Sequence, residues 1–167
     1  MNDAQELWWR QARSDHALFV QSRRAGIDEC HLLHYLQMAT EKLSKAYFWR
    51  SGHSPPRTHT GFVRFLKALL DRRADLDRIA SGLGFRRRED LDNWVRNVQV
   101  LAYALQNIAP AEAGDGPNPE YPWPHDTPAH CPIGHKFVLW EQLSNTGRGR
   151  KLMEFIGRAV ASFEDYA

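Results

Sequence analysis

The sequence predicts an all-α protein: a single-domain bundle of about five helices that covers residues 1–167. Two observations carry this prediction. Apolar residues recur every three or four positions through most of the chain, which places them on one face of a helix. In addition, no pair of alternating segments forms a convincing β-hairpin signal, and no internal repeat is present. We expect neighbouring helices to lie mostly antiparallel.

The first two helices are predicted over residues 3–24 and from Asp28 to about residue 52. Asp3 and Glu6 have the spacing of a capping box at the start of the first helix. Asp28 is expected to cap the second helix, whose apolar face is formed by Leu32, Leu36, Ala39, Leu43 and Ala46.

One acid lies on the apolar face of the first helix. Asp15 shares that face with Trp8, Ala12 and Phe19. Our interpretation is a structural carboxylate that pairs with an Arg or Lys or caps a neighbouring helix. The alternative is a carboxylate of a functional site.

Three more helices and one short helical turn follow. Thr58 is expected to cap a helix that continues to residue 70, and a short turn is expected at residues 76–79. The fourth helix begins at Glu89 or Asp90 and ends near Ile108, and the last helix covers residues 150–166. Residues 135–143 fit a short strand or a short helix equally well.

A long irregular loop is predicted at residues 110–134, before the last helix. Most of the prolines of the chain lie in it, and proline interrupts both helices and central strands. The run Glu120-Tyr121-Pro122-Trp123-Pro124 supplies aromatic side chains, so we expect the loop to pack against the helices. Long loops of this kind in compact domains are often functional.

Composition points to a cytoplasmic protein without a membrane segment. The net charge is +2, so global charge favours neither a nucleic acid nor a membrane as partner. The beginning of the chain lacks the features of a signal peptide, and no apolar run approaches the roughly 18 residues of a membrane-spanning helix. The chain has 2 cysteines, Cys30 and Cys131, which do not make a disulfide framework, so we expect reduced thiols.

The second helix also has a polar face, formed by His34, Gln37, Glu41 and Lys45 at helical spacing. One interpretation is a solvated face with an ordinary Glu41–Lys45 ion pair, worth about 0.3–0.5 kcal/mol. The other is a polar groove between the second and third helices. His59, which follows the proline-rich turn, is a candidate to face that groove.

Other chemistries have weaker support in the sequence. The residues His125, His130, Cys131 and His135 are metal-ligand types, but their spacing is not that of a structural zinc site, so we expect no metal. A nucleophile elbow, a phosphate loop and a dinucleotide fingerprint are all missing. We therefore predict no catalytic residue and no cofactor. The run Arg86–Arg88 is interpreted as a solvated connection, with phosphate binding as the alternative.

An ordered series of motifs resembles the HEPN domain family (higher eukaryotes and prokaryotes nucleotide-binding). The series consists of a Trp and an Asp on the first helix, the run from Gln37 to Ala46, and then Thr58-His59-Thr60 after a Pro-containing turn. Glu120-Tyr121-Pro122 is similar to the Arg-Tyr-Pro segment that follows the fourth helix in many members.

The resemblance implies a helical bundle that forms a homodimer. Many members are toxins, ribonucleases or partners of a minimal nucleotidyltransferase, often in toxin–antitoxin or host-defence operons. Ribonuclease members carry an Arg followed by a His after four to six residues in the C-terminal half. No such pair is found in this half of the sequence. The expectation is therefore a non-enzymatic member.

We accordingly expect a HEPN-like protein that binds a nucleotide, a nucleic acid or a protein partner. The expected ligand-binding residues are Glu41, Lys45 and His59, with His34 and Tyr121 nearby. Lys45 would meet an anionic group, His59 would donate to it, and Glu41 would orient Lys45. Two alternatives stay open: a divergent ribonuclease that uses His59 or a histidine of the loop, and a pure interaction subunit that binds its partner through Trp8, Trp9 and Trp123.

Overall fold

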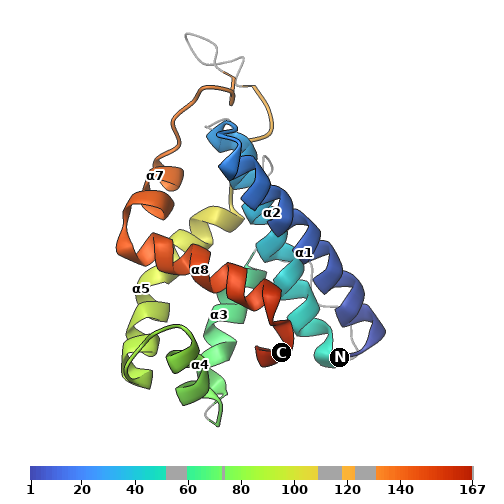
Figure 1. Ribbon diagram of the computed structural model, residues 1–167, viewed down its shortest axis with the longest axis vertical. Helices are drawn as coiled ribbons and strands as arrows, with labels where there is room; N and C mark the ends of the chain where they lie inside the picture. The colour runs from blue at the N-terminus through green and yellow to red at the C-terminus, as the bar shows by residue number, and fades with distance from the viewer. Residues whose placement is uncertain (52–59, 73, 109–117, 123–130, 167) are drawn as a thin grey trace.

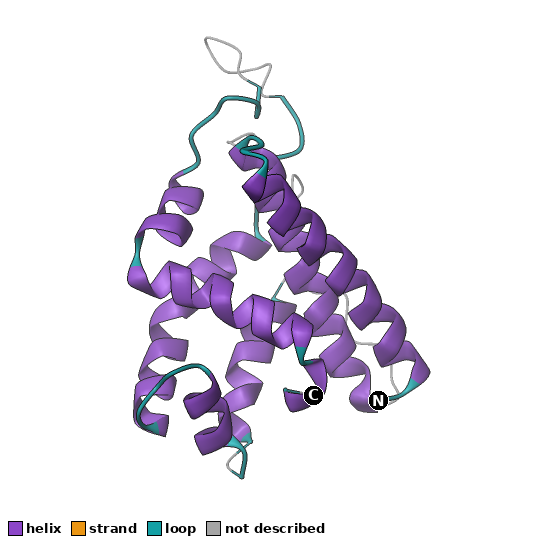
Figure 2. Ribbon diagram, viewed as in Figure 1, coloured by secondary structure: helices purple, strands orange, loops and turns teal. Residues whose placement is uncertain are grey.

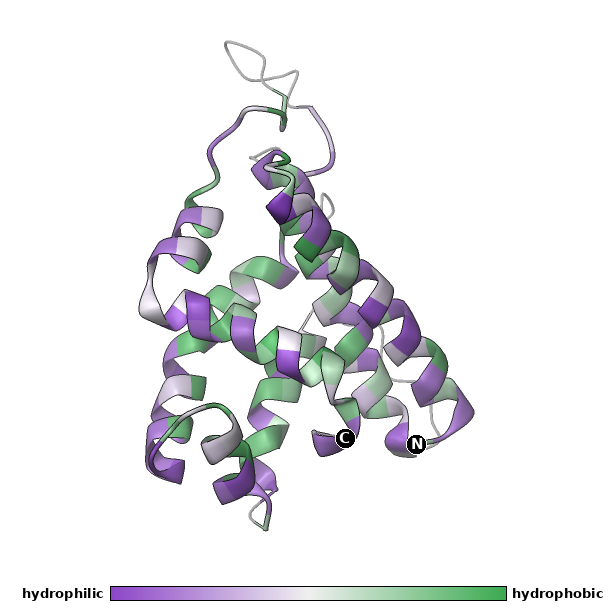
Figure 3. Cartoon of the chain, in the orientation of Figure 1, coloured by the Kyte–Doolittle hydropathy of each residue, from purple (hydrophilic) through white to green (hydrophobic). Residues whose placement is uncertain are grey.

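The structure is a computed structural model that describes residues 1–51, 60–72, 74–108, 118–122 and 131–166 (Figure 1). Within these ranges it contains seven α-helices and no strand, which confirms the predicted all-α class (Figure 2). Hydrophobic and hydrophilic positions alternate along the helices, as expected when each helix buries one face (Figure 3).

The first two helices form an antiparallel hairpin, α1 (Asp3–Arg24) and α2 (Glu29–Phe48), extended by a 3₁₀ turn at Trp49–Ser51. The predicted cap at Asp3 is wrong by one residue, because Asn2 caps α1 and forms a capping box with Gln5. Asp28 does precede α2, but its side chain accepts a hydrogen bond from the Gly134 backbone N–H at 3.1 Å instead of capping the helix.

The remaining long helices close the bundle: α3 (Gly61–Asp71), α5 (Arg88–Gln106) and α8 (Gly147–Ala161), followed by a 3₁₀ turn at Phe163–Asp165. Thr58, the predicted cap of the third helix, lies outside the described residues. The centre of the core is aromatic, with the ring centroid of Phe155 between 5.6 and 6.5 Å from those of Phe62, Phe65, Trp94 and Tyr166.

The predicted number of five helices is too low, because α4 (Leu76–Gly82) and α7 (Val138–Asn145) are also helical. Contacts from distant residues stabilise α7. Glu29 accepts a hydrogen bond from the Phe137 N–H before the helix, and Arg150 donates to the Asn145 carbonyl at its end. The irregular loop is therefore followed by α7 and not directly by the last helix.

Helix α8 crosses α1 (Figure 1). The indole N–H of Trp9 donates to the Val160 carbonyl at 2.7 Å. A Cβ atom at Gly157 would stand 3.4 Å from the ring of His16, which is an ordinary van der Waals contact. Burial at this crossing lowers the pKa of His16.

Asp15 is a structural carboxylate, as its position on the apolar face indicated. It is 7% exposed and accepts a hydrogen bond from Lys42 Nζ of α2 at 2.6 Å. The side-chain amide of Gln11 donates to its other oxygen at 3.1 Å. The α1–α2 hairpin is thus joined by a largely buried ion pair as well as by apolar packing.

The described part of the long loop forms a turn around Asn118 and contacts α2 through Glu120, whose carboxylate lies beside His34. Asn118 is buried, and its side-chain oxygen accepts hydrogen bonds from the backbone N–H groups of Glu120 and Tyr121. Tyr121 itself is 59% exposed, so the expected aromatic anchoring is wrong for this residue. Trp123 lies outside the described residues.

No helix in the part of the chain that the structure describes combines the length and apolar character needed to cross a membrane.

Candidate functional site

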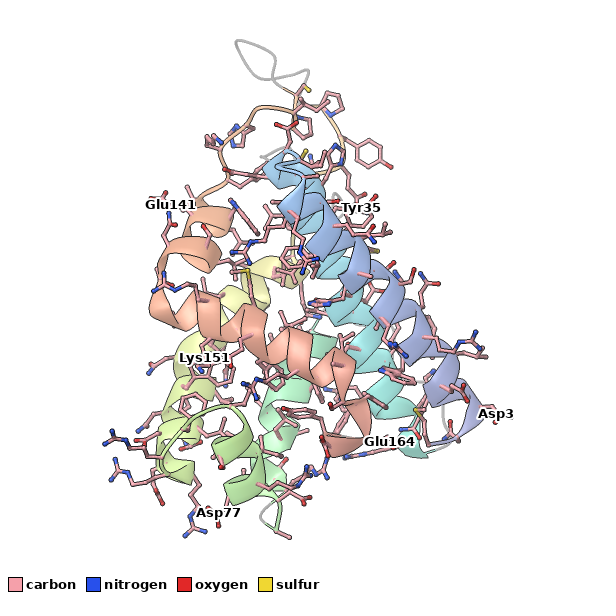
Figure 4. All side chains as sticks on the ribbon, in the orientation of Figure 1. Asp3, Tyr35, Asp77, Glu141, Lys151 and Glu164 are labelled. Carbon is pink, nitrogen blue, oxygen red and sulfur yellow. The ribbon has the colours of Figure 1, made fainter. Side chains whose placement is uncertain are left out.

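The polar face of α2 is the strongest candidate site among the described residues. Its members His34, Gln37, Glu41 and Lys45 lie on one side of the helix, because steps of three, four and four residues return to nearly the same direction. From His34 to Lys45 this face extends about 16 Å along the helix axis. Tyr35, labelled in Figure 4, marks its end nearer to the irregular loop.

Glu41 and Lys45 form the predicted ion pair. Lys45 Nζ lies 2.5 Å from Glu41 Oε1 and 4.7 Å from the centre of the Trp8 ring of α1. Both side chains are about one third exposed, so the pair contributes little to stability and an incoming anion can compete with Glu41 for the ammonium group. The ammonium group of Lys45 thus contacts both Glu41 and Trp8, and the sequence did not indicate the contact with Trp8.

His34 interacts with the irregular loop through Glu120. Its Nδ1 lies 2.9 Å from Glu120 Oε1, and both side chains are partly exposed. Tyr121 follows directly in the chain, so the structure brings this predicted residue near His34, but Glu120 makes the contact. The glutamate was visible in the sequence only as the residue before Tyr-Pro, with no signal that it would reach α2.

Gln37 lies between these two pairs and has an unsatisfied polar atom. The residue is 4% exposed, and its side-chain oxygen Oε1 is buried without a hydrogen-bond partner among the residues that the structure describes. A buried acceptor left unpaired costs about 1–3 kcal/mol, and such groups in native proteins call for an explanation. On a helix, Gln37 is the neighbour of both His34 and Glu41.

The start of α3 lies close to the same side of α2. A Cβ atom at Gly61 would stand 2.8 Å from Ser44 Oγ, so a larger residue here would require the Ser44 hydroxyl to move. Gln106 of α5 is buried here and accepts a hydrogen bond from the Val63 backbone N–H at 3.2 Å. The predicted site residue His59 lies outside the described residues, so its position relative to Lys45 stays a prediction.

The other sequence candidates have structural explanations or lie outside the described residues. No group of three metal-ligand side chains occurs among the residues that the structure describes. The His135 ring packs against Phe137, and Cys131 is exposed, whereas His125 and His130 lie outside the described ranges. Burial raises the pKa of the Cys30 thiol, which favours its inert thiol form.

The arginine run before α5 is largely neutralised by neighbouring acids. Arg87 pairs with Asp90 at 3.0 Å, and Arg88 pairs with Glu89 at 3.2 Å. These pairs agree with the interpretation of residues 86–88 as a solvated connection. The side-chain hydrogen bond and charge of Arg87 lower the pKa of Asp90.

The fold and site together define a helical bundle with a polar helix face on which the buried Oε1 of Gln37 has no partner in the described part of the chain. Comparison with models of known protein families, with curated proteins and with solved structures finds no match for this chain.

Proposed function

We propose that this chain is a non-catalytic, HEPN-like protein that binds a nucleotide on the polar face of α2. The observation that carries the proposal is the buried Oε1 of Gln37, which lies between His34 and the Glu41–Lys45 pair and has no hydrogen-bond partner in the described ranges of the chain. A ligand that donates an N–H to this oxygen and presents an anion to Lys45 satisfies both groups. A nucleotide has both features, in its base and its phosphates.

The roles of the residues follow from their contacts. Lys45 meets the phosphate, and Glu41 and the Trp8 ring hold its ammonium group in place beforehand. The side-chain oxygen of Gln37 accepts a hydrogen bond from an N–H group of the base. His34 and Tyr121 border the same face, and the His34–Glu120 contact keeps the 118–122 segment beside it. His59 remains the proposed second donor to the phosphate, and a homodimer remains the proposed assembly.

Thermal unfolding with a panel of ATP, AMP, GTP and inorganic phosphate tests the proposal. A nucleotide at about one hundred times its dissociation constant should add ~2.7 kcal/mol of stability, which is a shift of several degrees for a chain of this size. Lys45→Ala should lose most of this shift, because the phosphate loses its charged partner.

Lys136→Ala is the matched control, since it also removes a lysine paired with a glutamate, here Glu29 at the start of α2. This variant should keep the full shift. Equal shifts in all three proteins, or no shift with any nucleotide, would refute nucleotide binding at Lys45.

The alternative of a pure interaction subunit relied on exposed tryptophans, and the partial burial of two of them gives it less support. Trp8 and Trp9 are only partly exposed and pack against the core, and Trp9 stacks on Phe163 with ring centroids 6.4 Å apart. They are therefore needed for the fold. The histidines that a divergent ribonuclease would use, His59 and those of the loop at positions 125 and 130, lie outside the described residues.

A further inference from the structure

Helix α1 carries an unusual set of arginines. Arg10, Arg13, Arg23 and Arg24 are all exposed, and none of them lies within salt-bridge distance of an acid in the part of the chain that the structure describes. Asp15 is the one acid of α1 beyond its first turn, and it is buried in its pair with Lys42. The exposed side of α1 is therefore positive along most of its length.

The other helices show that this arrangement is not general in the molecule. Most of the remaining cations are paired within their own helix or its neighbour, as in Arg96–Asp92, Arg72–Asp75, Lys151–Glu154 and Arg158–Glu154. These local pairs place positive and negative side chains next to one another on the surface of the other helices. The charge of α1 stands out because no exposed acid is interleaved with its arginines.

The spacing of the α1 arginines fits an extended anionic polymer better than a small anion. Arg10, Arg13 and Arg24 fall within about 60° of one another around the helix axis, and they extend about 21 Å along it. No single small anion reaches all three. A nucleic-acid strand, which carries a phosphate on every nucleotide, can reach all three arginines. The planar guanidinium group binds phosphate oxygens with two parallel hydrogen bonds.

Two of these arginines lie on tryptophan rings. Arg13 Cζ is 4.9 Å from the centre of the Trp9 ring, and Arg23 Cζ is 6.0 Å from that of Trp140 on α7. At these distances both guanidinium groups make cation–π contacts with the indole rings, and each keeps an outer side that a base can approach. Unpaired bases stack on arginine planes and aromatic rings, which favours a single-stranded nucleic acid over an acidic protein.

A membrane surface fits less well. Amphipathic helices that bind bilayers insert an apolar face, whereas the apolar face of α1, with Ala12 and Phe19, is buried in the core. We propose that the exposed arginine face of α1 binds single-stranded nucleic acid, with Arg10, Arg13 and Arg24 on phosphates and Arg23 beneath a base. Helix α1 lies along one edge of the molecule (Figure 1), and the proposed surface does not depend on the nucleotide site of α2.

Fluorescence anisotropy with a labelled single-stranded oligouridylate of 20 nucleotides tests the proposal at 50 and 200 mM salt. With three phosphate contacts, the logarithm of affinity should fall against the logarithm of salt with a slope of about −2.1. Arg13→Gln/Arg24→Gln removes two of these contacts. It should reduce the slope to about −0.7 and weaken binding about tenfold at 50 mM salt.

The matched control is Arg87→Gln/Arg96→Gln, which changes the net charge equally but removes exposed arginines that are already paired with acids. This variant should bind within about twofold of the wild type. Equal weakening in both double variants, or no binding by the wild type at 50 mM salt, would overturn the proposal.

An abasic strand of the same length separates nucleic acid from other polyanions. The stacking of a base on Arg23 predicts that this strand binds several-fold more weakly than oligouridylate. If the abasic strand or a polyglutamate peptide binds as tightly as the RNA, the surface accepts any polyanion and the assignment to nucleic acid is wrong.

Discussion

Gly149→Ala should lower the free energy of unfolding by about 3 kcal/mol or more, because the corner between α7 and α8 has no room for a side chain. A Cβ atom at this position would lie 2.6 Å from the Leu143 Cα and would overlap the Gln142 carbonyl oxygen. Both neighbours are backbone atoms, so they cannot rotate away. Leu143 is fully buried, and the strain therefore reaches the core.

Gly147→Ala is the control for this prediction, since no atom lies within 4 Å of a Cβ built there. It lies in the first turn of the same helix and should change stability by less than about 1 kcal/mol. Urea unfolding of the two variants provides the measurement. A Gly149→Ala protein as stable as the wild type would show that α7 and α8 do not pack at this corner.

Lys42→Met should destabilise the protein by about 3 kcal/mol, because it leaves the Asp15 carboxylate buried without its cation. The pair is short, at 2.6 Å, and the two side chains are only 18% and 10% exposed. Gln11 still donates to Asp15, but a neutral amide does not replace a buried positive charge.

The double variant Asp15→Leu/Lys42→Met should recover most of the lost stability, since apolar residues often replace a buried ion pair at little cost. Lys136→Met gives the contrast for an exposed pair and should cost less than about 1 kcal/mol, because Lys136 is 86% exposed. Chemical unfolding of these variants measures the free energies of unfolding that are compared here. If Lys42→Met and Lys136→Met cost the same, the Asp15 pair is not buried in solution.

The long helices could be predicted because their signals are local. The apolar spacing in α1, α2 and α5 needs only the order of residues, and the Glu41–Lys45 pair follows from helical geometry. Helix α7 could not be assigned from its own residues. Its ends are satisfied by Glu29 and Arg150, which come from a distant helix and from the helix that follows.

The candidate site was predicted only in part for the same reason. The polar stripe of α2 was visible, but the burial of Gln37 depends on what covers it in the fold. The contact of His34 with Glu120 depends on the path of the irregular loop. The arginines of α1 could not be singled out, since whether a cation is paired depends on where the carboxylates of other elements lie.

The polar face of α2 is tested most directly by thermal unfolding of Gln37→Leu, with and without the nucleotide that stabilises the wild type. Leucine has a similar volume and removes the unpaired buried oxygen, so the unliganded variant should be as stable as the wild type or more stable. The stabilisation by nucleotide should be lost. A less stable variant that keeps the full nucleotide shift would show that the Gln37 amide serves the fold, and would contradict a binding site at this face.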